Sequence, residues 1–60
     1  MTAEMEQLKQ LLRVTWDGNL IDKYARKRLV ERGYAQQSEG WNFLTKAGVK
    51  ALVDFGLLKS

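Results

Sequence analysis

Apolar and polar residues follow helical and then strand periods along this 60-residue chain, and they predict three helices and one hairpin. An apolar stripe at three- and four-residue steps predicts a first helix over residues 2–13 with one buried face. The stripe consists of Met5, Leu8 and Leu12, with Leu11 beside it. Thr2 can cap the start of this helix, because its hydroxyl oxygen can accept a backbone N–H of the first turn.

A second helix is predicted over residues 22–33, with Ala25 and Leu29 on its buried side. Asp22 can accept a backbone N–H of the first turn and so cap the start. Gly33 can end the helix, because glycine adopts the left-handed conformation at a helix terminus without a Cβ clash.

The segment that joins these two helices changes character twice. Residues 14–16, Val-Thr-Trp, favour an extended backbone, and residues 17–19, Asp-Gly-Asn, favour a turn. We expect a turn with a short extended piece near residues 18–21, which can add an edge strand to a sheet. A helix that begins early, near Asn19, is the competing interpretation.

Residues 34–44 have the pattern of a β-hairpin. Ser38-Glu39-Gly40 suits a three-residue loop with a left-handed glycine at its last position. Trp41 and Phe43 alternate with Asn42, so the two aromatic rings share one face of a strand. We expect that face to pack on the helices; stacking on nucleic-acid bases is the alternative.

A last helix is predicted over residues 45–56, capped by Thr45 and ended by Gly56. Gly48 inside it costs about 1 kcal/mol relative to alanine, which indicates a close contact at that position. Its apolar stripe consists of Ala47, Ala51, Leu52 and Phe55. Together the elements predict one small α+β domain over residues 1–60.

The composition excludes several chemistries. The chain has no cysteine and no histidine, so disulfides, thiol nucleophiles and the commonest metal ligand are absent. The acidic residues are scattered and no glycine-rich phosphate loop is present, so we expect no enzyme, no cofactor, no metal and no small-molecule substrate. The apolar runs are too short to span a bilayer, and the first residues lack a signal-peptide layout. We therefore expect a cytoplasmic protein without membrane contact.

The net charge of +3 is concentrated in residues 22–34, which carry five basic and two acidic residues. On a helical wheel Lys23, Arg26 and Lys27 fall within about 100° of each other, away from the buried side. Such a stripe can neutralise DNA phosphates. The alternative is a solvated face that keeps a small protein soluble.

Apolar residues outside the predicted stripes offer a second kind of surface. Trp16 lies beside the predicted turn, and Phe55, Leu57 and Leu58 form an apolar terminus. They predict an interaction surface for a protein partner or a second copy of the chain. The alternative is that the terminus completes the core.

The order of these motifs resembles the winged-helix part of bacterial regulators of the MarR and PadR type. A helix ending in residues 29–34, Leu-Val-Glu-Arg-Gly-Tyr, is followed by a short hairpin and by residues 44–48, Leu-Thr-Lys-Ala-Gly. The resemblance covers about residues 20–56. The matching positions are Arg26, Leu29, Val30, Gly33, Leu44, Thr45 and Gly48.

The resemblance implies that residues 22–33 form a recognition helix and residues 36–41 a wing. Lys23, Arg26 and Lys27 would then face the major groove, and Gln36 or Gln37 would contact the DNA backbone. It implies a small DNA-binding or regulatory protein. A protein-interaction module, or a homodimerising protein that binds no nucleic acid, is the alternative, since residues 17–21 are too short for the helix that normally precedes the recognition helix.

Overall fold

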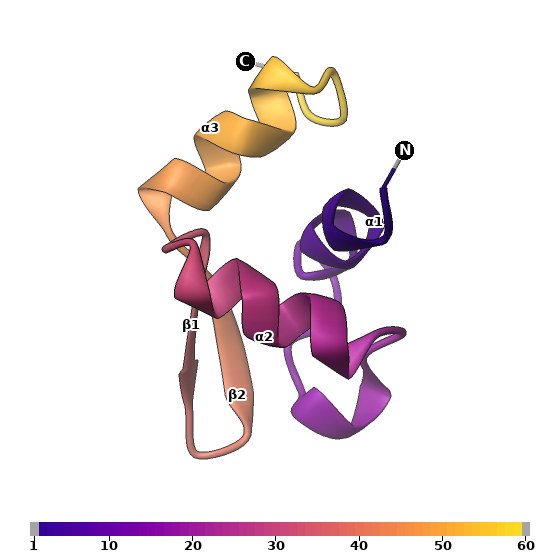
Figure 1. Cartoon of the computed structure of the whole chain (residues 1–60), viewed down its shortest axis with the longest axis vertical. Helices are drawn as coiled ribbons and strands as arrows, with labels where there is room; N and C mark the ends of the chain where they lie inside the picture. The colour runs from indigo at the N-terminus through magenta and orange to yellow at the C-terminus, as the bar shows by residue number, and fades with distance from the viewer. Residues whose placement is uncertain (1, 60) are drawn as a thin grey trace.

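The computed structural model describes residues 2–59 and contains three helices and a two-stranded antiparallel hairpin (Figure 1). In chain order the elements are α1 (Ala3–Gln10), the 3₁₀ turn η1 (Asp17–Asn19), α2 (Lys23–Glu31), β1 (Ala35–Ser38), β2 (Trp41–Leu44) and α3 (Lys46–Asp54). The predicted α+β class and the order of elements are confirmed. Each helix is shorter than predicted because its outermost residues belong to caps and turns.

The predicted caps at the helix starts and the predicted stop at Gly33 are confirmed. Each cap side chain accepts a backbone N–H in the first turn: Thr2 from Met5 at 3.2 Å, Asp22 from Ala25 at 2.9 Å and Thr45 from Gly48 at 3.0 Å. Gly33 follows α2 with a φ of 80°, and the N–H of Tyr34 donates to the carbonyl of Leu29 at 2.9 Å. This is the hydrogen bond of a Schellman motif, so local sequence alone sets where α2 ends.

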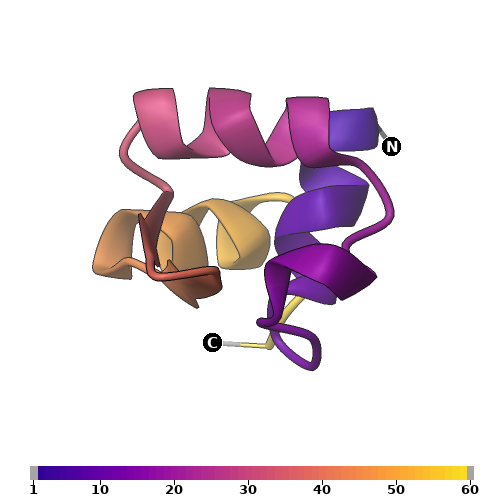
Figure 2. The same cartoon turned by 90° about the horizontal axis from the view of Figure 1, so that it is seen from below.

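The core lies between the three helices, which surround the centre of the molecule in Figure 2. Its buried members are Met5, Leu8, Leu11, Leu20, Leu29, Ala35, Ala51 and Leu52. Leu12, predicted in the stripe of the first helix, is 42% exposed, whereas Leu11 is buried. The reason is that α1 ends at Gln10 and the chain turns there, which rotates the last leucines relative to a continued helix.

The start of α3 is attached to the end of α2. The hydroxyl of Thr45 donates to the carbonyl of Gly33 at 2.6 Å, and the N–H of Thr45 donates to the carbonyl of Tyr34 at 3.2 Å. A Cβ atom at Gly48 would overlap with that same Tyr34 carbonyl. The predicted close contact at Gly48 is therefore confirmed, and only glycine fits there.

The hairpin is tighter than predicted. Its register pairs Ala35 with Leu44 and Ser38 with Trp41. Only Glu39 and Gly40 remain in the loop, with φ values of 51° and 83°. The predicted three-residue loop is wrong: two left-handed residues, as in a type I′ turn, match the twist of the strands better.

The hairpin gains one edge contact from the segment before η1. Trp16 forms an isolated antiparallel bridge with Trp41, and the N–H of Asn42 donates to the carbonyl of Thr15 at 2.9 Å. The predicted extended piece near residues 18–21 is wrong, because residues 17–19 form the turn η1. The edge contact lies two residues earlier, where the β-branched and aromatic residues favour it.

Candidate nucleic-acid interface

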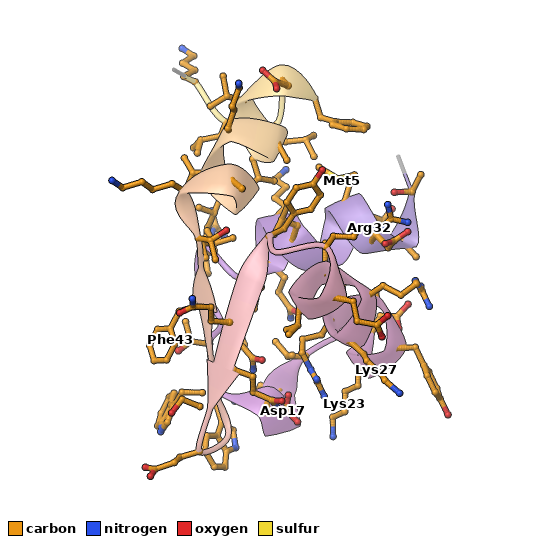
Figure 3. The ribbon with its side chains drawn as sticks, turned by 60° about the vertical axis from the view of Figure 1, so that its left-hand side comes forward. Met5, Asp17, Lys23, Lys27, Arg32 and Phe43 are labelled. Atoms are coloured by element: carbon orange, nitrogen blue, oxygen red, sulfur yellow. The ribbon has the colours of Figure 1, made fainter. Side chains whose placement is uncertain are left out.

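The helix α2 buries one side and exposes the other. Ala25 and Leu29 are fully buried, as predicted. Lys23, Tyr24 and Lys27 are exposed, and Figure 3 shows Lys23 and Lys27 pointing to the same side of the molecule, away from Phe43. The two ammonium groups stand one helical turn apart, a spacing that places them on one face.

Two glutamines of α1 hold the chain that leads into α2. The side-chain oxygen of Gln7 accepts the N–H of Asp22 at 2.8 Å, and that of Gln10 accepts the N–H of Ile21 at 2.9 Å. The amide of Gln10 also donates to the carbonyl of Asn19 at 3.2 Å. These side chains satisfy backbone groups that would otherwise need a partner. The three-residue turn η1 can therefore occupy the place of the helix that normally precedes the recognition helix in a winged-helix domain.

Arg26 lies in a polar cluster between α2 and the hairpin. Its Nε is 3.2 Å from Asp17 Oδ1, an ionic contact without a directed hydrogen bond from that nitrogen, and its Nη1 donates to Gln37 Oε1 at 3.2 Å. The amide groups of Gln37 and Asn42 donate to the same Asp17 oxygen at 3.0 and 3.3 Å. One carboxylate thus joins η1, α2 and both strands.

The cluster changes what Arg26 can do. Its side chain is only 17% exposed and that of Asp17 24% exposed, so the pair is largely withdrawn from water. A guanidinium paired in this way has less charge to offer a phosphate. The structure places Arg26 as a brace between the helix and the hairpin, whereas the sequence grouped it with Lys23 and Lys27 on an open face.

The second basic pair of α2 is also matched by an acid. Arg32 Nε lies 2.9 Å from Glu4 Oε1, and Arg28 Nε lies 3.7 Å from the same oxygen. Within residues 2–59, Lys23 and Lys27 are therefore the two basic residues of α2 and its C-cap without an ion-pair partner. They form the lysine pair of α2.

The two glutamines predicted to contact DNA lie on opposite faces of β1. Gln36 pairs with Phe43 and shares the outer face of the hairpin with it, while Gln37 pairs with Asn42 on the inner face. Gln37 is occupied by Arg26 and Asp17, as described above. Of the two, Gln36 is the residue with a side chain free of protein hydrogen bonds among the described residues.

The outer face of the hairpin contradicts the expectation that its aromatic rings pack on the helices. Trp41 and Phe43 are 46% and 51% exposed, whereas Asn42 between them is fully buried. The amide of Asn42 donates to the carbonyl of Thr15 at 3.0 Å and to Asp17. These hydrogen bonds hold Asn42 inside, and strand alternation then turns both rings outward.

Trp16 joins these rings, while the C-terminal residues divide between core and surface. The rings of Trp16 and Trp41 lie 4.9 Å apart at 60°. Leu57 and Leu58 are half-buried against the core, and Phe55 is 60% exposed. Of the predicted interaction surface, Trp16 and Phe55 are therefore the open members.

Sequence reasoning placed none of Gln7, Gln10, Asp17 and Asn42 in the candidate site, although each organises it. Asn42 alone carried a signal, because a polar residue between two aromatic ones leaves open which side of the strand is buried. Residues 2–59 contain no group of three or more metal-ligating His, Cys, Asp or Glu side chains. No helix in the described part of the chain has the length and apolar character needed to cross a membrane.

Comparison of the chain with protein-family models, with curated proteins and with solved structures found no significant match.

Proposed function

We propose that this chain is a small winged-helix-like protein that binds duplex DNA through the lysine pair of α2. The observation that carries the proposal is the placement of this pair. Lys23 and Lys27 are exposed on one side of the helix that precedes the hairpin, and neither has an ion-pair partner within residues 2–59. A helix in this position is the one that a winged-helix protein inserts in the major groove.

The surroundings of the lysine pair support the same function. The exposed Tyr24 can donate a hydrogen bond to a phosphate oxygen. The brace of Arg26 and Asp17 holds the hairpin beside α2, so helix and hairpin can approach one duplex as a single rigid unit. Gln36, with its free side chain, lies on the outer face of the hairpin beside Phe43, so the lysine pair and Tyr24 carry the phosphate contacts.

The charge that is free sets the strength of binding. The two lysines can neutralise two phosphates, which gives a slope of about −1.8 in log K against log salt concentration. Binding of this kind is weak and largely independent of DNA sequence. We expect roughly a tenfold loss of affinity when the salt concentration rises fourfold.

Titration of a labelled duplex with the whole chain tests this function, read by fluorescence anisotropy at two salt concentrations. The double variant Lys23→Ala/Lys27→Ala is expected to lose at least roughly tenfold in affinity at low salt. The control is Lys9→Ala/Lys50→Ala, which removes two exposed lysines from α1 and α3 and so changes the net charge by the same amount. No binding by the wild type at low salt, or equal losses in both double variants, would overturn the proposal.

A further inference from the structure

The outer face of the hairpin is an apolar surface that no helix of residues 2–59 covers. Trp16, Trp41 and Phe43 lie on it side by side, each between 45% and 51% exposed. Figure 3 shows Phe43 pointing away from all three helices. Both tryptophans of the chain are among the three residues, which we name the aromatic face.

Two glycines make room for Trp16 on this face. A Cβ at Gly40 would lie 2.9 Å from Trp16 Cζ3, and one at Gly18 would lie 2.8 Å from Trp16 Nε1. The absence of side chains at both positions lets the indole ring lie close to Gly18 and Gly40 and beside Trp41. Two tilted rings 4.9 Å apart make a fixed apolar platform.

The size of the aromatic face matches an interaction surface. With about half of each ring exposed, three aromatic side chains present roughly 300 Å² of apolar surface, since each buries about 150–250 Å² when fully covered. That is as large as the largest apolar patch on a typical monomer. Two such faces supply roughly 600 Å² of the total of roughly 1,000 Å² that a specific interface needs, which leaves roughly 400 Å² to the polar residues around them.

The charges around the aromatic face indicate what covers it. Glu39, at the hairpin tip, is the one charged residue in residues 35–44, and Lys46 stands at the hairpin base as the first residue of α3. Neither has an ion-pair partner within residues 2–59. Proteins that stack bases on aromatic rings also carry a positively charged groove for the phosphates. The two strands carry no basic residue, which argues against nucleic acid on this face.

We infer that the aromatic face binds the aromatic face of a second copy of this chain. A two-fold axis that lies in the interface above β2, between Trp41 and Phe43 and at right angles to the strand, turns the two aromatic faces toward each other and reverses the strand direction. It places Trp41 of one copy on Phe43 of the other, and Glu39 of one copy opposite Lys46 of the other. The surface is then complementary to itself in both shape and charge, as a two-fold interface requires.

This inference does not rest on the proposed function. Figure 3 shows Lys23 and Lys27 pointing away from Phe43, a member of the aromatic face, so a dimer leaves the lysine pair open to DNA. The variant Lys23→Ala/Lys27→Ala is therefore expected to dimerise as the wild type does. Failure of DNA binding and failure of dimerisation are separate outcomes.

Sedimentation equilibrium of the whole chain, from micromolar to millimolar concentration, tests the dimer. The wild type is expected to dimerise, with tryptophan emission shifting to shorter wavelength as the rings leave water. Trp41→Thr and Phe43→Thr, which keep a strand-forming residue, are expected to remain monomeric with an unchanged circular dichroism spectrum. A monomeric wild type at millimolar concentration, or dimers that persist in both variants, would overturn the inference.

A charge exchange keeps the test decisive if a threonine variant fails to fold. Glu39→Lys and Lys46→Glu are each expected to weaken the dimer at least about threefold, and together to restore it, because two ion pairs become two like-charge contacts and then ion pairs again. Glu6→Lys and Lys9→Glu on the exposed side of α1 are the matched control and are expected to change nothing. Two single variants without effect would overturn the arrangement. If the chain stays monomeric and an oligonucleotide quenches its tryptophan emission, the inference is overturned, because nucleic acid and not a second copy then binds the aromatic face.

Discussion

The outer face of α2 and the outer face of the hairpin differ in how the rest of the molecule uses their side chains. On α2 and its C-cap, three basic residues are paired with carboxylates, and the side chain of Arg26 is only 17% exposed. On the hairpin, both tryptophans and Phe43 stay about half exposed. At α2 a charged side chain is therefore largely buried, whereas at the hairpin large aromatic side chains remain exposed.

The comparison teaches that residue type does not decide burial in so small a domain. The core is already filled by leucines from α1, α2 and α3, and little interior volume remains for large rings. Between α2 and the hairpin lie instead Arg26, Gln37 and Asn42, whose polar atoms contact Asp17. A polar cluster of this kind fixes one geometry, because its members need particular partners.

The largest effect is expected from Gly48→Ala, because this substitution forces the start of α3 away from Tyr34, the residue that precedes the hairpin. The new Cβ would overlap with the carbonyl of Tyr34, so we expect a loss of about 3 kcal/mol in the free energy of unfolding. A domain of this size has only about 3–5 kcal/mol from its core, so the variant should be largely unfolded by circular dichroism. Gly56→Ala is the control: it has a φ of 75° and no atom within 4 Å, and should lose only about 1 kcal/mol. Equal losses of stability in the two variants would contradict the close contact between Gly48 and the Tyr34 carbonyl.

The difference in burial between the core and the outer face of the hairpin is tested by one residue from each. Leu29→Ala removes a fully buried side chain and should cost about 3 kcal/mol in urea unfolding. Phe43→Thr removes an exposed ring and should cost less than about 1 kcal/mol, when measured at micromolar concentration to avoid dimers. A loss at Phe43 as large as that at Leu29 would mean that the ring is buried after all.

The brace between α2 and the hairpin has a smaller expected effect. Asp17→Asn leaves Arg26 without its carboxylate and should cost about 1–2 kcal/mol, reduced from the value for a fully buried pair because both side chains keep some contact with water. Asp54→Asn removes the same charge from an exposed position on α3 and should change stability by less than about 0.5 kcal/mol. A double-mutant cycle with Arg26→Gln should give a coupling of at least about 0.5 kcal/mol. Strict additivity would show that the brace has no net effect.

Local chemistry allowed most of the fold to be predicted. The caps at Asp22 and Thr45, the stop at Gly33 and the place of the hairpin depend on residues within a few positions of each other. The close contact at Gly48 was also visible, because a glycine inside a helix needs a reason. These features depend on neighbouring residues and not on contacts with distant parts of the chain.

The candidate site was less predictable because its contacts join distant residues. The fate of Arg26 depends on Asp17 and Gln37, nine and eleven positions away. The side of β2 that is buried depends on the bonds of Asn42 to Thr15 and Asp17 across at least 25 positions. Alternation defines two faces of a strand but does not say which of them meets the helices.

The measurement that tests the account most directly is the salt dependence of duplex binding for Arg26→Ala beside Lys27→Ala. We expect Lys27→Ala to reduce the slope of log K against log salt by about 0.9, because one phosphate contact is lost. Arg26→Ala should lower affinity through misplacement of the hairpin while the slope stays at the wild-type value. An equal reduction of the slope in both variants would make Arg26 a phosphate contact and contradict its role as a brace.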